Sequence, residues 1–263
     1  MTISVAIGGA TGWTGAPLAA AVHASDDLTL RAGIARGAAG HDLGSTIAQS
    51  FWDVPVYAEL DAALHGVDVY VDYTRHDVVK AHALAAIARG VHVVIGSSGL
   101  TADDFEVISE AAQQQGVGVI AAGNFALTAA LAQKAAVMVA EHLPTWEIID
   151  YASYAKPDAP SGTARELAEK LGAVHAPGIG VPVDAVAGPQ GIRGADVAGS
   201  RVHSVRQPGF VVSTQVVFGL PSQRLTIAFD AGESPQPYVD GTLLAIRRVM
   251  DVRGLVRGLE SLL

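Results

Sequence analysis

The feature that most constrains the fold is a glycine-spaced turn, GATGWTG (residues 9–15), directly after an apolar run of strand length, ISVAIG (residues 3–8). An alanine-rich helical pattern follows. A strand, a glycine turn and a helix in this order are typical of a dinucleotide-binding βαβ unit. Gly9 permits the tight turn, Gly12 lets a pyrophosphate approach the backbone, and Gly15 allows close packing of helix on strand. The alternative is a βα turn that binds nothing, and the position at the start of a βαβ pattern favours the dinucleotide site.

Strand-like and helical patterns continue to alternate as far as Asn124, which predicts a doubly wound parallel sheet and an α/β fold. The predicted strands are residues 28–35, 54–56, 67–72, 91–95 and 117–122, and the segment 37–50 is expected to be loop. Thr101 and Asp104 predict a capping box at the start of one helix. Such sheets bind ligands outside the carboxyl ends of their strands. The residues expected at those ends are Tyr73, Thr74, Arg75, Gly96, Ser97, Ser98, Asn124 and Phe125.

The end of the second predicted strand bears on cofactor choice. A site that prefers NAD usually has Asp or Glu there, to bind the ribose 2′-hydroxyl. This chain has Ala35 and Arg36 instead. A cation without the acidic residue suits a 2′-phosphate, so NADPH is favoured and NADH is the alternative. Arg36 could otherwise be a solvated surface side chain.

After Asn124 the pattern changes to strands that follow strands, which predicts a second α+β domain with a mixed sheet. A helix is expected over 127–142, and strands over 146–151, 201–206, 210–218 and 224–230. Two further helices are expected, over 238–250 and 255–262. The predicted domains are a dinucleotide-binding domain, residues 1–124 with 232–263, and a substrate-binding and oligomerisation domain, residues 125–231.

The stretch KPDAPSGTA (residues 156–164) places a cation, a rigid turn and two hydroxyls before a helical pattern, residues 165–171. Gly172 is expected to end this helix, and Thr163 with Glu166 to form its capping box. A helix start beside a lysine forms an anion cradle. The alternative is an ordinary proline-bounded loop before a capped helix.

Composition excludes several classes. Half of the 263 residues are apolar and 16% are charged, so a large core is expected. A net charge of −9 without a basic run argues against nucleic acid or a membrane as partner. There are no cysteines, and the nine histidines lack metal-ligand spacing, so no metal is expected. No apolar run has the length of a membrane span, and the expected compartment is the cytoplasm.

Taken together, the chain resembles the dihydrodipicolinate reductase family, which reduces a cyclic imine-type intermediate on the route to lysine. The resemblance spans the whole chain in the expected order. It is carried by GATGWTG (9–15), VDYTR (71–75), VIGSSG (94–99), AAGNFA (121–126) and KPDAPSGTA (156–164).

The resemblance implies an N-terminal Rossmann domain and a substrate domain that forms a homotetramer. The nicotinamide is expected near residues 96–98 and 124–125. Lys156 matches the family's proton donor, and a small carboxylate-bearing substrate is expected at Ser153, Lys156, Ser161, Gly162 and Thr163. With the glycine turn and Arg36 argued above, the full set of expected cofactor residues is Gly9, Thr11, Gly12, Trp13, Thr14, Arg36, Tyr73, Thr74, Arg75, Gly96, Ser97, Ser98, Asn124 and Phe125.

The chain departs from the family pattern just before the lysine. Ala152 and Ser153 replace a pair of histidines, and the family's G-E-H segment is Val212-Ser213-Thr214 here. Because reduction of an imine also needs a proton, Lys156 remains as the general acid, helped by Tyr151, Tyr154 or His203. These losses predict a reductase with altered substrate specificity.

Two other functions remain open, and the spacing of the tyrosines argues against a third. The chain could be the authentic lysine-pathway enzyme with a substituted acid. It could also be a sensor that binds NADP(H) without catalysis, which the lost contacts favour and the retained lysine opposes. A short-chain dehydrogenase would need Tyr-x-x-x-Lys, but Tyr151 and Tyr154 lie five and two residues before Lys156.

Overall fold

The computed structural model describes residues 2–232 and 234–263. The chain divides into two compact units. Unit 1 comprises Met1–Phe125 and Pro235–Leu263, and unit 2 comprises Ala126–Ser234. Each is described by itself below.

Unit 1 is built on one parallel sheet. Among the residues described, seven strands form it in the order β12-β6-β5-β4-β1-β2-β3. Its central strands are apolar on both faces, as in β1, where Val5, Ala6 and Ile7 are fully buried, because helices cover both sides of such a sheet. The strands are β1 (Ile3–Gly8), β2 (Leu28–Ile34), β3 (Val56–Tyr57), β4 (Val69–Asp72), β5 (His92–Ile95), β6 (Gly118–Ala121) and β12 (Gly254–Arg257).

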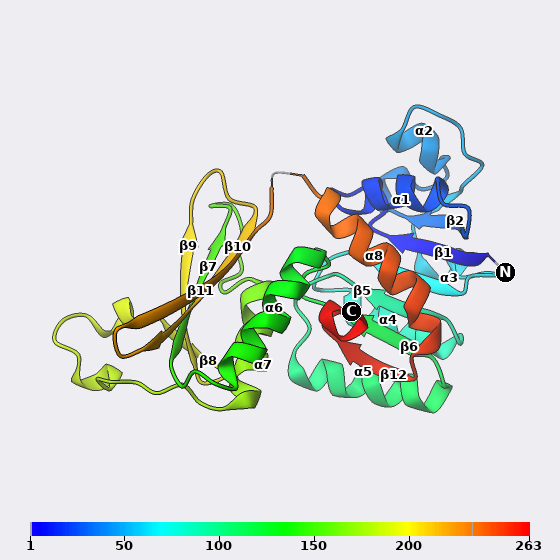
Figure 1. Ribbon diagram of the computed structural model, residues 1–263. Coiled ribbons are helices and arrows are strands. Elements are labelled where there is room, and N and C mark those ends of the chain that lie inside the picture. Colours follow the sequence, from blue (N-terminus) through cyan, green and yellow to red (C-terminus); the bar gives the residue numbers. More distant parts are fainter. Residues whose placement is uncertain (1, 233) are drawn as a thin grey trace. The chain divides into compact units, whose positions relative to one another are not determined.

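The helices of unit 1 alternate with these strands (Figure 1). They are α1 (Gly15–His23), α2 (Leu43–Ile47), α3 (Leu60–Ala63), α4 (Val79–Ala88), α5 (Ala102–Gln115) and α8 (Gln236–Arg248), with short 3-10 turns at Arg36–Ala38, Val249–Asp251 and Leu259–Leu262. The predicted capping box of α5 is confirmed, since Thr101 and Asp104 exchange side-chain and backbone hydrogen bonds. Strand β1 lies between β2 and β4, so the connections leave it on both sides, and its carboxyl end is a binding position in this fold class.

Unit 2 is a mixed sheet, as predicted. Within its described residues, five strands lie in the order β11-β10-β7-β9-β8; β7 and β9 are parallel and the other neighbours antiparallel. Helices α6 (Leu127–Ala140) and α7 (Gly162–Val174) lie on one face (Figure 1). The strands are β7 (Trp146–Ala152), β8 (Ala195–Val197), β9 (Ser200–Arg206), β10 (Val212–Leu220) and β11 (Gln223–Asp230), with 3-10 turns at Val183–Ala185 and Gln190–Arg193.

Two predicted elements of unit 1 were wrong. The expected helix over 255–262 is instead strand β12 followed by a 3-10 turn, because Gly254–Arg257 pairs in parallel with β6. The expected loop over 37–50 contains helix α2, whose cap, Asp42, accepts a hydrogen bond from the Ser45 amide. In each case four or five residues carry too short a pattern to be identified without their tertiary neighbours.

The expected start and end of α7 were also wrong. Ser161, not Thr163, is the N-cap, since its hydroxyl accepts from the Ala164 amide and the helix begins at Gly162. Gly172 does not end the helix, which runs on to Val174. A Cβ at Gly172 would overlap the carbonyl oxygen of Ala198, so this glycine serves close packing against the β8–β9 turn.

Candidate active site

The glycine turn between β1 and α1 has three differently constrained positions. Gly9 has φ +73°, and a Cβ there would overlap the carbonyl oxygen of Tyr73. A Cβ on Gly15 would overlap the carbonyl oxygen of Gly9. Gly12 is exposed, and a Cβ there would meet only that same oxygen, at 3.0 Å. Gly9 and Gly15 therefore shape the turn, whereas Gly12 leaves its outer surface open.

A buried carboxylate joins the loops that follow β4 and β5. Asp72, at the end of β4, is fully buried. Its Oδ1 accepts from the Thr74 hydroxyl (2.6 Å), the Thr74 amide (2.9 Å) and the Ser97 hydroxyl (2.6 Å). Its Oδ2 accepts from the Tyr70 hydroxyl at 2.7 Å, and His82 Nδ1 lies 3.4 Å away. This network holds two of the predicted cofactor residues, Thr74 and Ser97, at one edge of the sheet.

The charge of this carboxylate is stabilised in place. Burial by itself would raise the pKa of Asp72, but hydrogen bonds from His82, Ser97 and Thr74 outweigh it and hold the pKa below its ordinary value. Burial, and then the charge of Asp72, raises the pKa of Tyr70 well above its ordinary value. Tyr70 is therefore a hydrogen-bond donor to an ionised Asp72.

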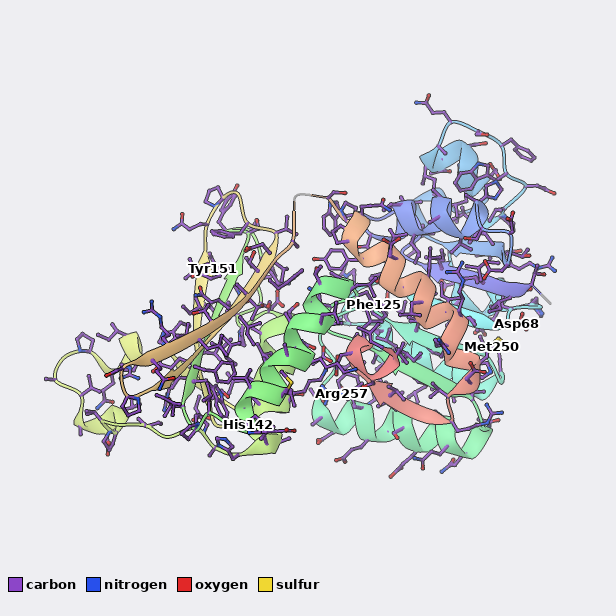
Figure 2. All side chains as sticks on the ribbon, in the orientation of Figure 1. Asp68, Phe125, His142, Tyr151, Met250 and Arg257 are labelled. Atoms are coloured by element: carbon purple, nitrogen blue, oxygen red, sulfur yellow. The ribbon has the colours of Figure 1, made fainter. Side chains whose placement is uncertain are left out.

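Aromatic packing positions the remaining loops of unit 1. The Tyr73 hydroxyl lies 2.7 Å from the Thr242 hydroxyl, and its ring meets Phe125 edge to face with centroids 6.2 Å apart. Phe125, labelled in Figure 2, is buried and is the last residue of the first chain segment of unit 1. A Cβ on Gly96 would overlap the Tyr73 ring, so the β5 loop needs glycine there. Burial raises the pKa of Tyr73, which keeps its phenol neutral.

The two predicted arginines and Trp13 lie on the surface of unit 1. Arg36 lies two residues beyond the end of β2, is exposed, and forms no ion pair within the residues described. Arg75 is bound by its neighbour Asp77 at 3.1 Å. Trp13 is 52% exposed and contacts Tyr238 edge to face. Of the two arginines, only Arg36 is thus available to an outside anion.

In unit 2 the lysine and the helix start belong to one short loop. Lys156 Nζ forms an ion pair with Asp158 Oδ1 at 2.8 Å, and its amide donates to the Ser153 carbonyl. Ser161 is 1% exposed and caps α7, so the first amides of the helix, at Gly162 and beyond, are directed toward this loop. The predicted substrate residues Ser153, Lys156, Ser161, Gly162 and Thr163 thus lie in this loop or in the first turn of α7, and a shared site for them stays a prediction.

A second buried carboxylate supports this loop. Asp150, near the end of β7, is fully buried, and its Oδ2 accepts from the Ser161 amide (2.9 Å), the Ser204 hydroxyl (3.1 Å) and Arg206 Nη2 (2.8 Å). Its other oxygen, Oδ1, is buried with no partner among the residues described. Arg206 lies on β9, the parallel neighbour of β7.

Tyr151 and Tyr154, the two predicted helpers of Lys156, lie in different surroundings. Tyr154, two residues before Lys156, is 71% exposed. Tyr151 follows Asp150 in β7, so it points to the opposite face of the sheet. There its hydroxyl donates to Gln215 at 3.3 Å and its ring stacks on Phe210. Tyr154 thus shares the loop of Lys156, whereas Tyr151 faces away toward Gln215 and Phe210.

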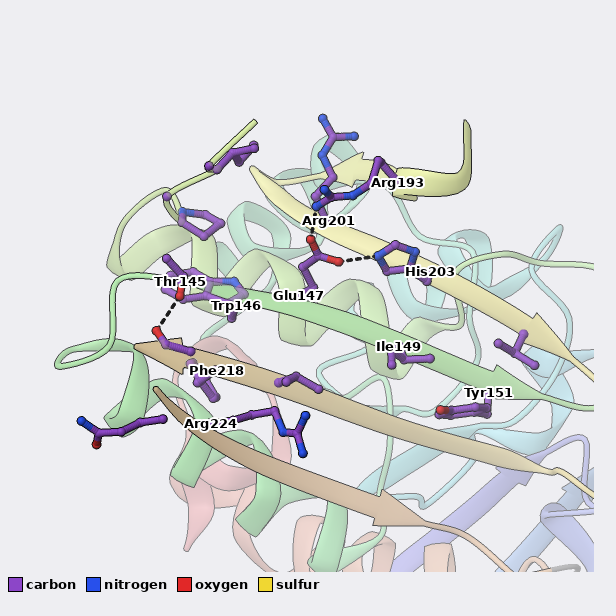
Figure 3. Close-up of a pocket in the computed structure, with 18 residues that line it drawn as sticks. Thr145, Trp146, Glu147, Ile149, Tyr151, Arg193, Arg201, His203, Phe218 and Arg224 are labelled. Carbon is purple, nitrogen blue, oxygen red and sulfur yellow. Dashed lines mark hydrogen bonds and ion pairs between the residues drawn. The ribbon is translucent and has the colours of Figure 1, made fainter. Parts of the chain in front are cut away.

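The face that carries Tyr151 contains a pocket of about 790 Å³. Figure 3 shows Glu147 among the residues that line it, bound by Arg193 and by His203, whose Nε2 lies 2.8 Å from Glu147 Oε2. Lys156 and the N-terminus of α7 do not line this pocket. His203, one of the predicted helpers of Lys156, instead lies against Glu147 in this pocket.

Asp72, Asp150 and Arg206 were missed as site residues by the sequence analysis. One signal for them is visible in the sequence, namely a charged residue inside or at the end of an otherwise apolar strand pattern. Buried charges of this kind are normally paired. Their partners, however, lie up to 56 residues away in the chain. Among the residues described, no acidic or histidine cluster could hold a metal ion, and no helix could span a membrane.

Comparison with known proteins covers the whole chain. The family model for the N-terminus of dihydrodipicolinate reductase matches residues 3–125, and that for its C-terminus matches residues 125–263. A 4-hydroxy-tetrahydrodipicolinate reductase of Geobacillus thermodenitrificans is 37% identical over 265 residues, covering all of both chains. One of Thermosynechococcus vestitus is 34% identical over 268 residues, covering 99% of this chain and 97% of the relative.

A solved structure shares the same architecture. The dipicolinate-bound dihydrodipicolinate reductase from Paenisporosarcina sp. TG-14 superposes with a TM-score of 0.78 at 32% identity, over the full length of both chains. These matches agree with the order of the motifs and with the two sheets described above. The chain belongs to the dihydrodipicolinate reductase family, a family of NAD(P)H-dependent oxidoreductases.

Proposed function

We propose that this protein is an NADPH-dependent reductase of a small, carboxylate-bearing cyclic imine, with a specificity shifted from that of the family. The observation that carries the proposal is the loop of Lys156, where a proton donor and a capped helix start lie within six residues. The similar structure that holds dipicolinate, a cyclic dicarboxylate, supports this substrate class.

The residues of unit 1 fit a phosphorylated dinucleotide. The open surface at Gly12 admits a pyrophosphate, and the first amides of α1 follow it. Exposed Arg36, without an acidic residue at the end of β2, suits the 2′-phosphate of NADPH. When bound, this cofactor supplies the hydride. The proposed contacts are those of Gly9, Thr11, Gly12, Trp13, Thr14, Arg36, Tyr73, Thr74, Arg75, Gly96, Ser97, Ser98, Asn124 and Phe125.

In unit 2, the proposed roles follow from charge and position. Ser153, Ser161, Gly162 and Thr163 bind the substrate carboxylate, because a helix N-terminus stabilises an anion. Lys156 donates the proton that balances the hydride at the reduced double bond. Asp158 orients its ammonium group through the 2.8 Å ion pair. Tyr154 assists from the surface of the same loop, and Tyr151 has the weaker claim.

The shift in specificity rests on the two positions before this loop. Ala152 is fully buried at the end of β7, whereas Ser153 is partly exposed and adjoins the lysine loop. Neither side chain can donate a proton to the substrate near neutral pH or carry a positive charge toward a second carboxylate, as a histidine could. The alternatives are an authentic lysine-pathway enzyme that relies on Lys156 alone and a non-catalytic NADP(H) sensor.

Turnover decides among these three functions. Oxidation of NADPH by the purified protein is measured with dihydrodipicolinate generated in place and with a panel of simple cyclic imines. Turnover confined to the other imines supports the proposal. Strong turnover of dihydrodipicolinate identifies the lysine-pathway enzyme instead, and binding of NADPH without any reduction identifies the sensor.

Restoring the histidines should return activity toward the family substrate. The double substitution Ala152→His with Ser153→His is expected to raise kcat/KM for dihydrodipicolinate by about 10-fold or more, because a positioned imidazole adds an acid and a carboxylate contact. The two single variants are the controls, and Ser153→His, at the more exposed position, should account for most of the gain. No gain in any variant would place the altered specificity elsewhere, for example at Val212-Ser213-Thr214.

Arg36 provides a test of cofactor choice. Arg36→Ala should weaken NADPH by about 10- to 100-fold and leave NADH almost unchanged, because only NADPH carries the 2′-phosphate that the guanidinium binds. Arg31→Ala removes another exposed arginine nearby, on β2, and should change neither affinity. Isothermal titration with both cofactors measures the effect, and equal weakening of the two would remove the assignment.

We also propose that residues 1–124 with 232–263 form the cofactor domain and residues 125–231 the substrate and oligomerisation domain. The assembly is a homotetramer, as the family resemblance implies, and the compartment is the cytoplasm. Sedimentation equilibrium tests the tetramer directly.

A further inference from the structure

The loop that carries Lys156 is held at two points by groups outside it. Arg206 Nη2 donates to the carbonyl oxygen of Asp158 at 2.8 Å, in the middle of the loop. At the end of the loop, the Ser161 amide donates to the carboxylate of Asp150 at 2.9 Å. The loop is thereby fixed on both sides of the Ala159-Pro160 turn.

A single guanidinium connects these two points. Arg206 Nη2 also donates to Asp150 Oδ2 at 2.8 Å, and Nη1 donates to the Asp150 and Val205 carbonyl oxygens at 3.3 and 3.0 Å. The side chain is only 17% exposed and Asp150 is not exposed at all. A planar, multidentate group is needed to reach a carboxylate and a loop carbonyl at once, which a lysine ammonium cannot reproduce in the same geometry.

We propose that Arg206 is a positioning residue for the reaction. It holds the Lys156–Ser161 loop in the conformation that presents the proton donor and the carboxylate cradle, and it neutralises Asp150 beneath that cradle. This assignment rests on the function proposed above. Without Arg206, a buried carboxylate would remain unneutralised next to the Ser161 amide, close to where a substrate anion binds, and like charges repel strongly in a buried setting.

The test compares Arg206→Ala with Arg201→Ala. Arg201 lies on the same strand with 16% of its side chain exposed, and it contacts the Gly194 carbonyl oxygen and the Asp196 carboxylate. Arg206→Ala should raise KM for the imine substrate about 10-fold and lower kcat by up to about 100-fold, with the NADPH dissociation constant unchanged. Arg201→Ala should leave all three constants within about twofold.

Two further readouts separate positioning from general damage. Millimolar guanidinium chloride should restore part of the activity of Arg206→Ala, whereas a variant that is merely destabilised would lose more. Hydrogen–deuterium exchange over residues 153–163, without any ligand, should be faster in Arg206→Ala than in the wild type and Arg201→Ala. Arg206→Lys keeps the positive charge but not the planar, multidentate geometry. It should show the faster loop exchange of Arg206→Ala, with a smaller rise in KM.

Each result decides something. The proposal is overturned if the Arg206 variants show the same loop exchange and the same kinetic constants as Arg201→Ala. If the wild type reduces no imine, the proposed function fails. The positioning role is then judged by loop exchange and by the affinity for dipicolinate, which Arg206→Ala should weaken about 10-fold. Unchanged exchange and affinity in that case would overturn the positioning role as well.

Discussion

Replacing Lys156 by alanine should lower kcat by about 100- to 10,000-fold while the dissociation constant of NADPH stays unchanged. The loss is that of a positioned general acid, since the structure places no other cationic side chain of the described residues in the 153–161 loop. The cofactor affinity should be insensitive because the cofactor contacts proposed above all lie in unit 1. Single-turnover kinetics with NADPH and the best imine substrate measures the chemical step directly.

The matched control for this result is Lys134→Ala. Lys134 is an exposed lysine on α6 in the same unit and lies outside the 153–161 segment, so its removal changes the net charge equally. Its kcat should stay within about twofold of the wild type. A Lys156→Ala enzyme with an unchanged rate would move the proton source elsewhere, and Tyr154→Phe would then be the next variant to measure.

Replacing Gly12 by valine should weaken NADPH binding on the order of 100-fold with almost no change in stability. The position is exposed, and an added Cβ meets only the Gly9 carbonyl oxygen at 3.0 Å, a contact that a shift of a few tenths of an ångström relieves. A pyrophosphate in close contact with this backbone would be excluded. The melting temperature should stay within about 2 °C.

Two other glycine variants serve as controls for Gly12→Val, one expected to disrupt folding and one expected to have no effect. Gly15→Val should fail to fold or melt much lower, because its Cβ would overlap the Gly9 carbonyl. Gly191→Val, at an open position in unit 2, should change neither stability nor affinity. Fluorescence titration with NADPH and thermal melting measure both quantities. Retained affinity in Gly12→Val would mean that the turn is a packing feature and holds no pyrophosphate.

Much of the architecture was predictable because its signals are local. A continuous apolar run such as residues 3–8, followed by a glycine turn, specifies a buried strand and a βα connection within about twenty residues of chain. The switch to successive strands after Asn124 likewise predicted the mixed sheet of unit 2. A loop followed by a helix was predictable at Lys156 for the same reason, since both signals lie in one nine-residue stretch, although the helix begins at Gly162, earlier than expected.

The sequence by itself determined the two sheets, the position of the glycine turn and the stretch that holds Lys156 and Ser161. Only the tertiary structure decided that residues 254–257 pair as a strand with β6, and that α7 runs through Gly172 against the Ala198 carbonyl. It alone also showed that Asp150 and Arg206, 56 residues apart, support the Lys156 loop from adjacent strands. The physical reason is the separation in sequence over which each interaction acts. Periodicity and capping act between neighbours in the chain, whereas strand register and the pairing of buried charges depend on segments that meet only after folding.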